Sequence, residues 1–410
     1  MKKLSMHWQI FFALVLAVLV GFFGGEKVVA FEYFGTVFIA ALKMMVMPVV
    51  SLSILTGVSN IKKTENLGKL GMKTLFYYVG TSFLAILTGL YLVNRMQPGV
   101  GAQLGLQAQP EGWTEALRQR ASGSAWETML DMTIRIVPDN PAQAFVQGEM
   151  MQVIVFCLLF GYFSTRVVEP YRTLLRDLFQ AGFRVTMRLM RAIMTLAPIG
   201  IFGLVVKIVA VSGVETFHSL GRYVATVSLG LGVHACITLP LVLKFIARVS
   251  PLEHFQAMST ALITAFSSSS SSAALPITLE SIRREVGVSS GVSGFVLPLG
   301  STMNMDGTAL YECVAVMFIA QAYGISLDIT QQCVLVFTAL LASIGAAGIP
   351  MAGVVMMAVV LKAVGLPLEG VGLILAVDRI LDMCRTTVNV WSDTCGAVVI
   401  ARSEGETLKI

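Results

Sequence analysis

The side chains best suited to chemistry lie near the end of the chain, in an otherwise apolar stretch. They are Asp378, Asp382, Arg385, Asn389 and Asp393, at spacings of four, three, four and four residues. That spacing places all of them on one face of an α-helix. A charged group at the centre of a membrane helix costs about 2.5–3.5 kcal/mol on insertion scales. We therefore expect this face to meet other polar groups, a cavity or a ligand.

The residue types indicate what this face could bind. The planar guanidinium of Arg385 can hold a carboxylate through two parallel hydrogen bonds. Asp382, one turn away, can accept an ammonium group, so the pair suits a substrate with both charges, such as an acidic amino acid. An internal salt bridge that only joins helices would explain Asp382 with Arg385. It would not explain three aspartates against one arginine, an excess of negative charge that favours cations.

A second polar group interrupts the apolar segment 288–323, at Asn304, Asp306 and Thr308. Hard cations prefer oxygen ligands, and unwound backbone carbonyls that coordinate Na⁺ recur in transporters. Asp306, like Asp393 of the later helix, therefore suits a hard monovalent cation, with neutral oxygens supplied by the residues around the break.

Further hydroxyl groups and one isolated carboxyl group lie in apolar surroundings. Tyr78, Thr81 and Ser82 share one face of a predicted helix, although Ser and Thr often bond only to their own helix. Glu312 has apolar neighbours on both sides. Burial favours the neutral form of a carboxyl group, and a titratable Glu at membrane depth is a candidate proton carrier. The alternative is a Glu312 that is simply hydrogen-bonded to a neighbour.

The composition indicates that membrane helices position these groups. Of the 410 residues, 56% are hydrophobic and only 13% are charged, against about 25% in a soluble domain. Such a chain could not cover a water-facing surface, which excludes a soluble enzyme, a nucleic-acid binder and a disordered protein.

Six apolar segments reach the length of about 20 residues that spans a bilayer. They are 8–25, 35–58, 74–94, 147–165, 190–212 and 222–247. The C-terminal half then repeats one pattern, in which a broken hairpin is followed by a long polar-faced helix. Its segments are 252–284 and 288–323, then 330–366 and 367–401.

The hairpins are broken at residues 267–272 and 343–350, and their turns are expected at 273–276 and 347–350. Each half is too short to cross a bilayer, so a pair of re-entrant hairpins fits, and such pairs point to a transporter binding site. The alternative is a flexible linker and a tight turn between ordinary helices. We predict an all-α polytopic membrane protein with eight transmembrane helices and two re-entrant hairpins.

The distribution of Lys and Arg predicts the orientation. Basic residues precede the first span, separate the second from the third, follow the fourth and sixth, and end the chain. All fall on one side if the hairpins re-enter from opposite sides, and that side is the cytoplasm. We expect both termini there, a first span that acts as an uncleaved signal anchor, and an outer loop at 96–140.

These motifs together resemble the glutamate/aspartate transporter family, the dicarboxylate and amino-acid:cation symporters. The resemblance covers nearly the whole chain, with motifs in order at 267–272, 304–312, 343–350 and 378–393. It implies inverted repeats, a homotrimer, and a transport domain that moves like an elevator against a scaffold. The scaffold would be 1–70 and 141–215, the transport domain 71–95 and 216–404, and the outer loop 96–140.

The resemblance also implies roles for single residues. The substrate would be bound by Ser269, Ser271, Thr308, Ile349, Gly353, Asp382, Arg385, Thr386 and Asn389. Three Na⁺ sites would use Asp393 with Gly300, Asn304 and Asn389; Tyr78, Thr81 and Ser82 with Asn304 and Asp306; and Thr308 with carbonyls from Ser343 to Ala346. Glu312 matches the proton-carrying position.

Two departures from the family pattern concern charge near the substrate. Archaeal sodium-coupled members carry Arg where this chain has Ser269, and animal excitatory transporters carry Arg where it has Met383. The role of this difference, and with it the coupling to H⁺ and K⁺, stays open.

We expect a secondary active symporter for glutamate or aspartate in the cell membrane (the inner membrane of a bacterium), driven by Na⁺ and also by H⁺. Alternatives with the same fold are a purely proton-coupled symporter and a neutral amino-acid carrier. An ion channel would also suit re-entrant segments. An intramembrane serine hydrolase is disfavoured, because the sequence has no nucleophile-elbow motif and no suitably placed His, and we expect no enzyme.

Overall fold

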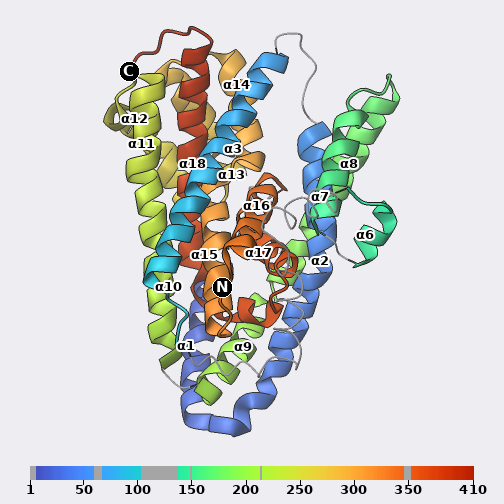
Figure 1. Cartoon of the computed structure of the whole chain (residues 1–410), viewed down its shortest axis with the longest axis vertical. Helices are drawn as coiled ribbons and strands as arrows, with labels where there is room; N and C mark the ends of the chain where they lie inside the picture. Colours follow the sequence, from blue (N-terminus) through green and yellow to red (C-terminus); the bar gives the residue numbers. More distant parts are fainter. Residues whose placement is uncertain (1–5, 60–66, 103–136, 148–149, 213–214, 346–351) are drawn as a thin grey trace, which may run out of the picture.

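The computed structural model describes residues 6–59, 67–102, 137–147, 150–212, 215–345 and 352–410. Within these ranges every regular element is a helix (Figure 1). The predicted all-α class is therefore confirmed for the described part of the chain.

One group of helices comes from the N-terminal half. Its members are α1 (Met6–Gly24), α2 (Glu32–Ser59), α6 (Pro141–Gln147), α7 (Met150–Ser164), α8 (Tyr171–Met194) and α9 (Ala197–Ser212). α2 packs against α7, α8 and α9, and α1 packs against α9. Figure 1 shows α2, α7 and α8 side by side along one flank of the molecule. The predicted span 190–212 covers only the end of α8 and all of α9, which form a pair bent by 52°.

The second group contains the helices that bear the polar motifs. It is formed by α3 (Leu67–Met96), α10 (Glu215–Val233), α12 (Pro251–Ser268), α13 (Ser271–Ser281), α14 (Ser290–Met303), α15 (Asp306–Ala322) and α18 (Val371–Ser403). α3 packs against α10 and α15, while α12, α14 and α15 pack against α18. α18 runs along this group as one long helix (Figure 1). All the predicted polar motifs of the last helix therefore share one rigid element.

α10 belongs to a longer helical run with two wide turns. A π turn at His234–Thr238 leads into α11 (Leu239–Val242), and a second π turn follows at Leu243–Ala247. By length and composition, two of the described helices can cross a membrane, Lys69–Met96 and His218–Ala247. The bent α8–α9 pair would add a third span if it crosses as one.

The first hairpin breaks inside the serine run, as the sequence predicts. α12 ends at Ser268, and its C-cap residue, Ser269, adopts the left-handed conformation with φ of 50°. The Ser270 hydroxyl then caps α13 by accepting a hydrogen bond from the Ala273 amide at 3.2 Å. The predicted turn at 273–276 is wrong, because these residues lie within α13 and Pro276 is helical. The position of the turn is determined by serine hydroxyls, which compete for backbone hydrogen bonds, and not by the proline.

The next break separates α14 from α15 at Asn304 and Met305, which have non-helical backbone angles. α16 (Ile329–Gly345) and α17 (Ala352–Ala363) form the two arms of the second hairpin. Its predicted turn at 347–350 lies outside the described residues.

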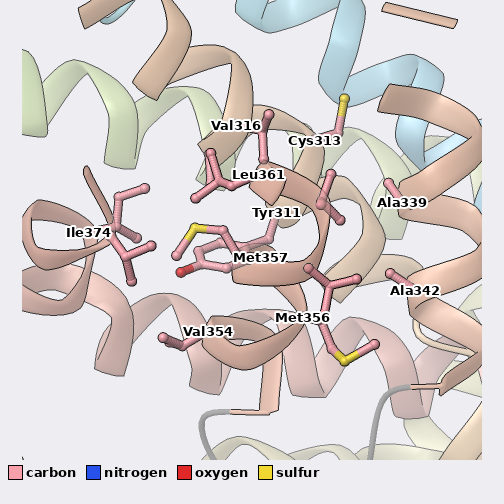
Figure 2. Close-up of a cluster of buried hydrophobic side chains, with 14 of the residues drawn as sticks. Tyr311, Cys313, Val316, Ala339, Ala342, Val354, Met356, Met357, Leu361 and Ile374 are labelled. Carbon is pink, nitrogen blue, oxygen red and sulfur yellow. The ribbon is translucent and has the colours of Figure 1, made fainter. Parts of the chain in front are cut away.

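α15 lies at the centre of the fold. Every residue from 306 to 320 is buried, which fits a helix that is apolar nearly all round. Figure 2 shows Tyr311 of this helix beside Met357 of α17 and Ile374 of α18, within one apolar cluster that also includes Ala342 of α16. The second hairpin therefore packs directly over the helix that begins at Asp306.

Close approach of α15 and α18 depends on Gly307, so we predict that Gly307→Ala destabilises the protein by about 1–3 kcal/mol. A Cβ atom at this position would lie 2.6 Å from the carbonyl oxygen and 3.0 Å from the Cα atom of Arg385. Thermal unfolding in detergent measures the effect. Gly80→Ala is the matched control, because a Cβ atom there would meet nothing within 4 Å. Equal melting temperatures for the two variants would contradict the prediction.

Candidate functional site

Arg385 lies at the centre of a buried charge cluster on α18. Its Nε and Nη2 atoms donate to Oδ1 of Asp382 at 3.0 and 2.8 Å, and its Nη1 donates to Oδ1 of Asp378 at 3.1 Å. The side chains of Arg385 and Asp378 are 1% and 0% exposed. Residues that the sequence spacing places on one helix face thus form a set of ion pairs. Removing either partner of such a buried pair would leave an uncompensated charge.

Other helices hold the guanidinium from the remaining sides. The Tyr311 hydroxyl of α15 donates to Oδ1 of Asp378 at 2.6 Å, and Cζ of Arg385 lies 4.2 Å from the centre of the Tyr311 ring. A Cβ atom at Gly353 of α17 would lie 2.6 Å from Nη1 of Arg385. The second hairpin therefore covers the guanidinium with bare backbone, which leaves space only for a residue without a side chain.

Arg379 corrects the charge count made from the sequence. Its Nη1 lies 3.7 Å from Oδ2 of Asp382, and its side chain is 17% exposed. The predicted count of three aspartates against one arginine omitted Arg379, a second cation beside Asp382, so the excess of negative charge between Asp378 and Asp393 is three aspartates against two arginines. The i,i+3 spacing of Arg379 and Asp382 was the available signal.

Asn389 joins α18 to the start of α15. Its Oδ1 accepts hydrogen bonds from the backbone amides of Gly307 and Thr308, at 2.7 and 3.3 Å. Its Nδ2 donates to the Thr308 hydroxyl at 3.0 Å. The first turn of a helix has backbone amides without intrahelical partners, and the side chain of the N-cap residue, Met305, does not cap α15. The Asn389 amide takes that role from another helix.

The Asp306 carboxylate collects polar groups from several helices. Its Oδ1 accepts from the Ser82 hydroxyl at 2.6 Å and from the Thr81 hydroxyl at 3.3 Å. Its Oδ2 accepts from the Ser392 hydroxyl at 2.6 Å and lies 3.1 Å from Nε2 of His234. The predicted group of Thr81, Ser82 and Asp306 is therefore assembled, as a fully buried set of oxygen atoms.

A neighbouring group surrounds Asp393. Its Oδ1 accepts from Nδ2 of Asn304 at 2.9 Å. A Cβ atom at Gly300 would lie 2.4 Å from that Oδ1 and 2.7 Å from the Tyr78 hydroxyl, so both groups converge on the Gly300 backbone. Tyr78 itself donates to the carbonyl of Val296 at 2.7 Å. The structure thus places Tyr78 beside Gly300 and Asp393, whereas Thr81 and Ser82 contact Asp306.

Asn304 links the two carboxylate groups. Besides Asp393, its Nδ2 reaches the Ser392 hydroxyl at 3.1 Å, and Ser392 in turn bonds Asp306. Its Oδ1 is buried and has no hydrogen-bond partner in the part of the chain that the structure describes. A buried carbonyl oxygen without a partner is costly, and here it is one more oxygen available to a cation. Among the described residues no group of three or more His, Cys, Asp or Glu side chains could hold a metal ion.

The remaining predicted residues are placed as follows. Ser269 is buried, and its hydroxyl has no hydrogen-bond partner within the described ranges. The Ser271 hydroxyl donates to the Ser301 carbonyl at 2.9 Å, so the turn of the first hairpin contacts α14. Thr386 is buried on α18. The Ser343 hydroxyl donates to Leu340 of its own helix, at 2.8 Å.

Ala346 and Ile349 lie outside the described residues. The predicted third cation site combines Thr308 with carbonyls of residues 343–346. The described residues show no contact that joins these two parts.

Glu312 is fully buried on α15, and neither of its carboxyl oxygens has a hydrogen-bond partner among the described residues. Within that part of the chain, the alternative interpretation of a Glu312 that is hydrogen-bonded to a neighbour is therefore wrong. A buried carboxyl group without partners favours its neutral form.

Sequence reasoning missed His234, Ser392 and Tyr311. The π turn at His234–Thr238 brings His234 to Asp306, and π turns often occur at functional sites. Ser392 lies three residues after Asn389 on the polar face of α18, which was a usable signal. Tyr311 gave none, because a tyrosine in an apolar helix is usually part of the core.

Comparisons with known proteins give one consistent result. A family model described as the sodium:dicarboxylate symporter family matches residues 6–403. The proton/sodium-glutamate symport protein of Geobacillus stearothermophilus is 32% identical over 99% of this chain and 96% of its own length. The proton/glutamate-aspartate symporter of Escherichia coli is 33% identical, over 98% and 93%. Excitatory amino acid transporter 3 of Mus musculus is 35% identical, over 92% and 80%.

The charge cluster generates a prediction about stability. Arg385→Ala leaves Asp378 and Asp382 buried without their main cation, so we expect a loss of roughly 3–5 kcal/mol in the ligand-free protein. Chemical unfolding in detergent, without substrate, measures the change. Adding Asp382→Asn to the Arg385→Ala variant should recover part of the loss, because it removes one of the stranded charges. A double variant less stable than the single one would count against the cluster.

Proposed function

Because the chain belongs to the sodium:dicarboxylate symporter family, we propose that it is a secondary active symporter for acidic amino acids, driven by Na⁺ and H⁺. As a member of a symporter family it is a transport protein and not an enzyme. The names of its relatives support glutamate or aspartate as the substrate, since they include glutamate and glutamate-aspartate symporters.

The observation that carries the proposal is the buried guanidinium of Arg385 with Asp382 beside it. A guanidinium binds the side-chain carboxylate of an acidic amino acid in a bidentate manner, and a carboxylate binds the ammonium group. Arg385 and Asp382 are 3 residues apart on one helix face, with 2.8 Å between Nη2 and Oδ1. A neutral amino acid lacks the second carboxylate that a bidentate contact with the guanidinium requires.

The other substrate contacts are proposed for the residues around this pair. They are Ser269 and Ser271 of the first hairpin, Thr308 of α15, Ile349 and Gly353 of the second hairpin region, and Thr386 and Asn389 of α18. Support comes from Asn389 and Thr308, whose side chains already share a hydrogen bond of 3.0 Å beside the Arg385 backbone.

The oxygen-rich groups are the proposed cation sites. One site would use Asp393, Asn304, Gly300 and Asn389; a second would use Asp306, Asn304, Tyr78, Thr81 and Ser82; a third would use Thr308, Ser343 and Ala346. Na⁺ is a hard cation that prefers carboxylate, hydroxyl and carbonyl oxygens. The converging oxygens at Gly300 and the partnerless Oδ1 of Asn304 support the first site.

The membrane arrangement is likewise a proposal. We infer eight transmembrane helices and two re-entrant hairpins in the cell membrane, with both termini in the cytoplasm. A scaffold of 1–70 and 141–215 would hold a homotrimer together, an outer loop would comprise 96–140, and a transport domain of 71–95 and 216–404 would move as an elevator. The division of the described helices into two packed groups supports this (Figure 1).

The proposal is tested by uptake of radiolabelled aspartate and glutamate into proteoliposomes, with and without an inward Na⁺ gradient. We expect uptake that requires Na⁺. Asp393→Asn should raise the half-saturating Na⁺ concentration at least about tenfold, because a carboxylate ligand is lost. Unchanged Na⁺ dependence in Asp393→Asn would contradict this site. Uptake driven equally well by a proton gradient without Na⁺ would favour the purely proton-coupled symporter.

The proton-carrying role is proposed for Glu312, because its buried carboxyl group has no hydrogen-bond partner among the residues that the structure describes. Glu312→Gln removes the titratable proton but keeps the shape, so we expect transport to lose most of its pH dependence while substrate binding persists. Uptake measured across a pH series, with binding measured in parallel, checks this. A Glu312→Gln protein with the wild-type pH profile would make Glu312 a structural residue.

A further inference from the structure

The two oxygens of the Asp306 carboxylate have different kinds of neighbour. Oδ1 accepts from the Ser82 hydroxyl at 2.6 Å and from the Thr81 hydroxyl at 3.3 Å, both on α3. Oδ2 accepts from the Ser392 hydroxyl of α18 at 2.6 Å and lies 3.1 Å from Nε2 of His234. The side chains of His234 and Asp306 are both 0% exposed. Each oxygen of this carboxylate therefore belongs to a different set of buried groups.

The hydroxyl groups at Oδ1 can change from donating a proton to coordinating a cation. A hydroxyl has one proton and two lone pairs, and it rotates to suit its neighbours. Oγ1 of Thr81 has alternative acceptors, since it lies 3.1 Å from the Tyr77 carbonyl oxygen and 3.3 Å from the Tyr78 carbonyl oxygen. When its proton points to one of these carbonyls, a lone pair is left for a cation at Asp306. The Oδ1 side can thus accept a cation through rotation of hydroxyl groups alone.

The Ser392 hydroxyl at Oδ2 lacks this freedom. It donates its single proton to Asp306 and accepts a hydrogen bond from Nδ2 of Asn304 at 3.1 Å. Both its proton and a lone pair are therefore committed to neighbouring side chains.

The His234 ring is a fixed donor on the same side. A ring nitrogen beside an ionised carboxylate carries the proton, and that nitrogen then has no lone pair for a cation. Nδ1 of His234 is buried and has no hydrogen-bond partner among the described residues, so a second N–H there would have no acceptor in that part of the chain. A neutral ring that donates from Nε2 fits these contacts, and it leaves the negative charge of Asp306 available to a cation.

The π turn at His234–Thr238 determines where this ring lies. The indole Nε1 of Trp391 donates to the carbonyl oxygen of Ala235, within this turn, at 3.1 Å. Trp391 directly precedes Ser392 on α18. One contact between α18 and the π turn therefore places both donors to Oδ2.

We propose that His234 is a positioning residue for the cation site at Asp306. Its hydrogen bond holds Oδ2, so that Na⁺ binds at Oδ1 with the hydroxyl oxygens of Thr81 and Ser82. The proposal rests on the proposed Na⁺-driven transport and extends it with a residue that does not itself contact the ion. Partners that orient a metal-binding carboxylate typically contribute about 10- to 100-fold to metal affinity.

Two neutral amide variants separate the hydrogen bond from the mere presence of a polar side chain. In His234→Gln the amide nitrogen can reach the position of Nε2 and donate to Asp306. In His234→Asn the side chain is one carbon shorter, so its amide reaches only the position of Nδ1. Wild-type behaviour is therefore expected of His234→Gln and not of His234→Asn.

The test is calorimetric titration of the purified full-length protein with L-aspartate over a series of Na⁺ concentrations, with choline replacing Na⁺. For His234→Asn we expect the half-saturating Na⁺ concentration to rise about tenfold or more, because the carboxylate loses a fixed donor. Aspartate affinity at saturating Na⁺ should stay within about threefold of wild type, since excess Na⁺ still fills a weakened site. His234→Gln should keep its half-saturating Na⁺ concentration within about threefold of wild type.

His218→Asn is the matched control, because His218 is an exposed histidine of the same helix, α10. Its Na⁺ dependence should equal that of the wild type. A wild-type Na⁺ requirement in His234→Asn, or aspartate binding that is weakened to the same extent at every Na⁺ concentration, would overturn the proposal. A Na⁺ requirement raised about tenfold in His234→Gln would overturn it even if His234→Asn does not fold. A wild-type protein that binds aspartate equally with and without Na⁺, or not at all, would instead overturn the proposed function.

Discussion

The fold is organised around a guanidinium that is almost entirely removed from water. Arg385 is 1% exposed, and α18, α15 and α17 each supply something that holds it: carboxylates, an aromatic face and bare backbone. Such a group persists away from water only with partners for its charge. The packing of α15 against α18 at Gly307 follows from the same requirement, since the two helices must approach closely enough to share these contacts.

The breaks in the helices have a common physical purpose. Where α14 ends and α15 begins, backbone and side-chain oxygens are available outside the helical hydrogen-bond pattern. Asn304 bonds both Asp393 and Ser392, and Ser392 donates to Asp306. Non-helical backbone is tolerated at membrane depth only beside protein or a cavity. The π turn at His234 and the serine turn of the first hairpin supply further polar groups to the same region. The proposed ion sites and the proposed substrate site are thus neighbours on α18, which would make coupling between them physically direct.

Much of this arrangement could be predicted from the sequence, because spacing along one helix is a local property. The polar face from Asp378 to Asp393 and the break at Asn304 are of this kind. The turn of the first hairpin was misplaced, since its position depends on which serine takes the left-handed conformation. His234 was missed because its partner, Asp306, lies 72 residues away along the chain. Arg379 was missed because the charge count covered only one face of the helix. Arg379 reaches Asp382 through its long side chain.

The central claim is that the buried charges are matched by a ligand bearing an ammonium group and a second carboxylate. Isothermal titration of the purified protein in Na⁺ with L-aspartate, and then with L-asparagine, tests it most directly. The two ligands differ only in whether the side chain carries the charge that Arg385 would bind. Saturable heat with aspartate and none with asparagine at the same concentrations is the predicted result. Equal binding of both, or no binding of aspartate or glutamate in any salt, would contradict the account.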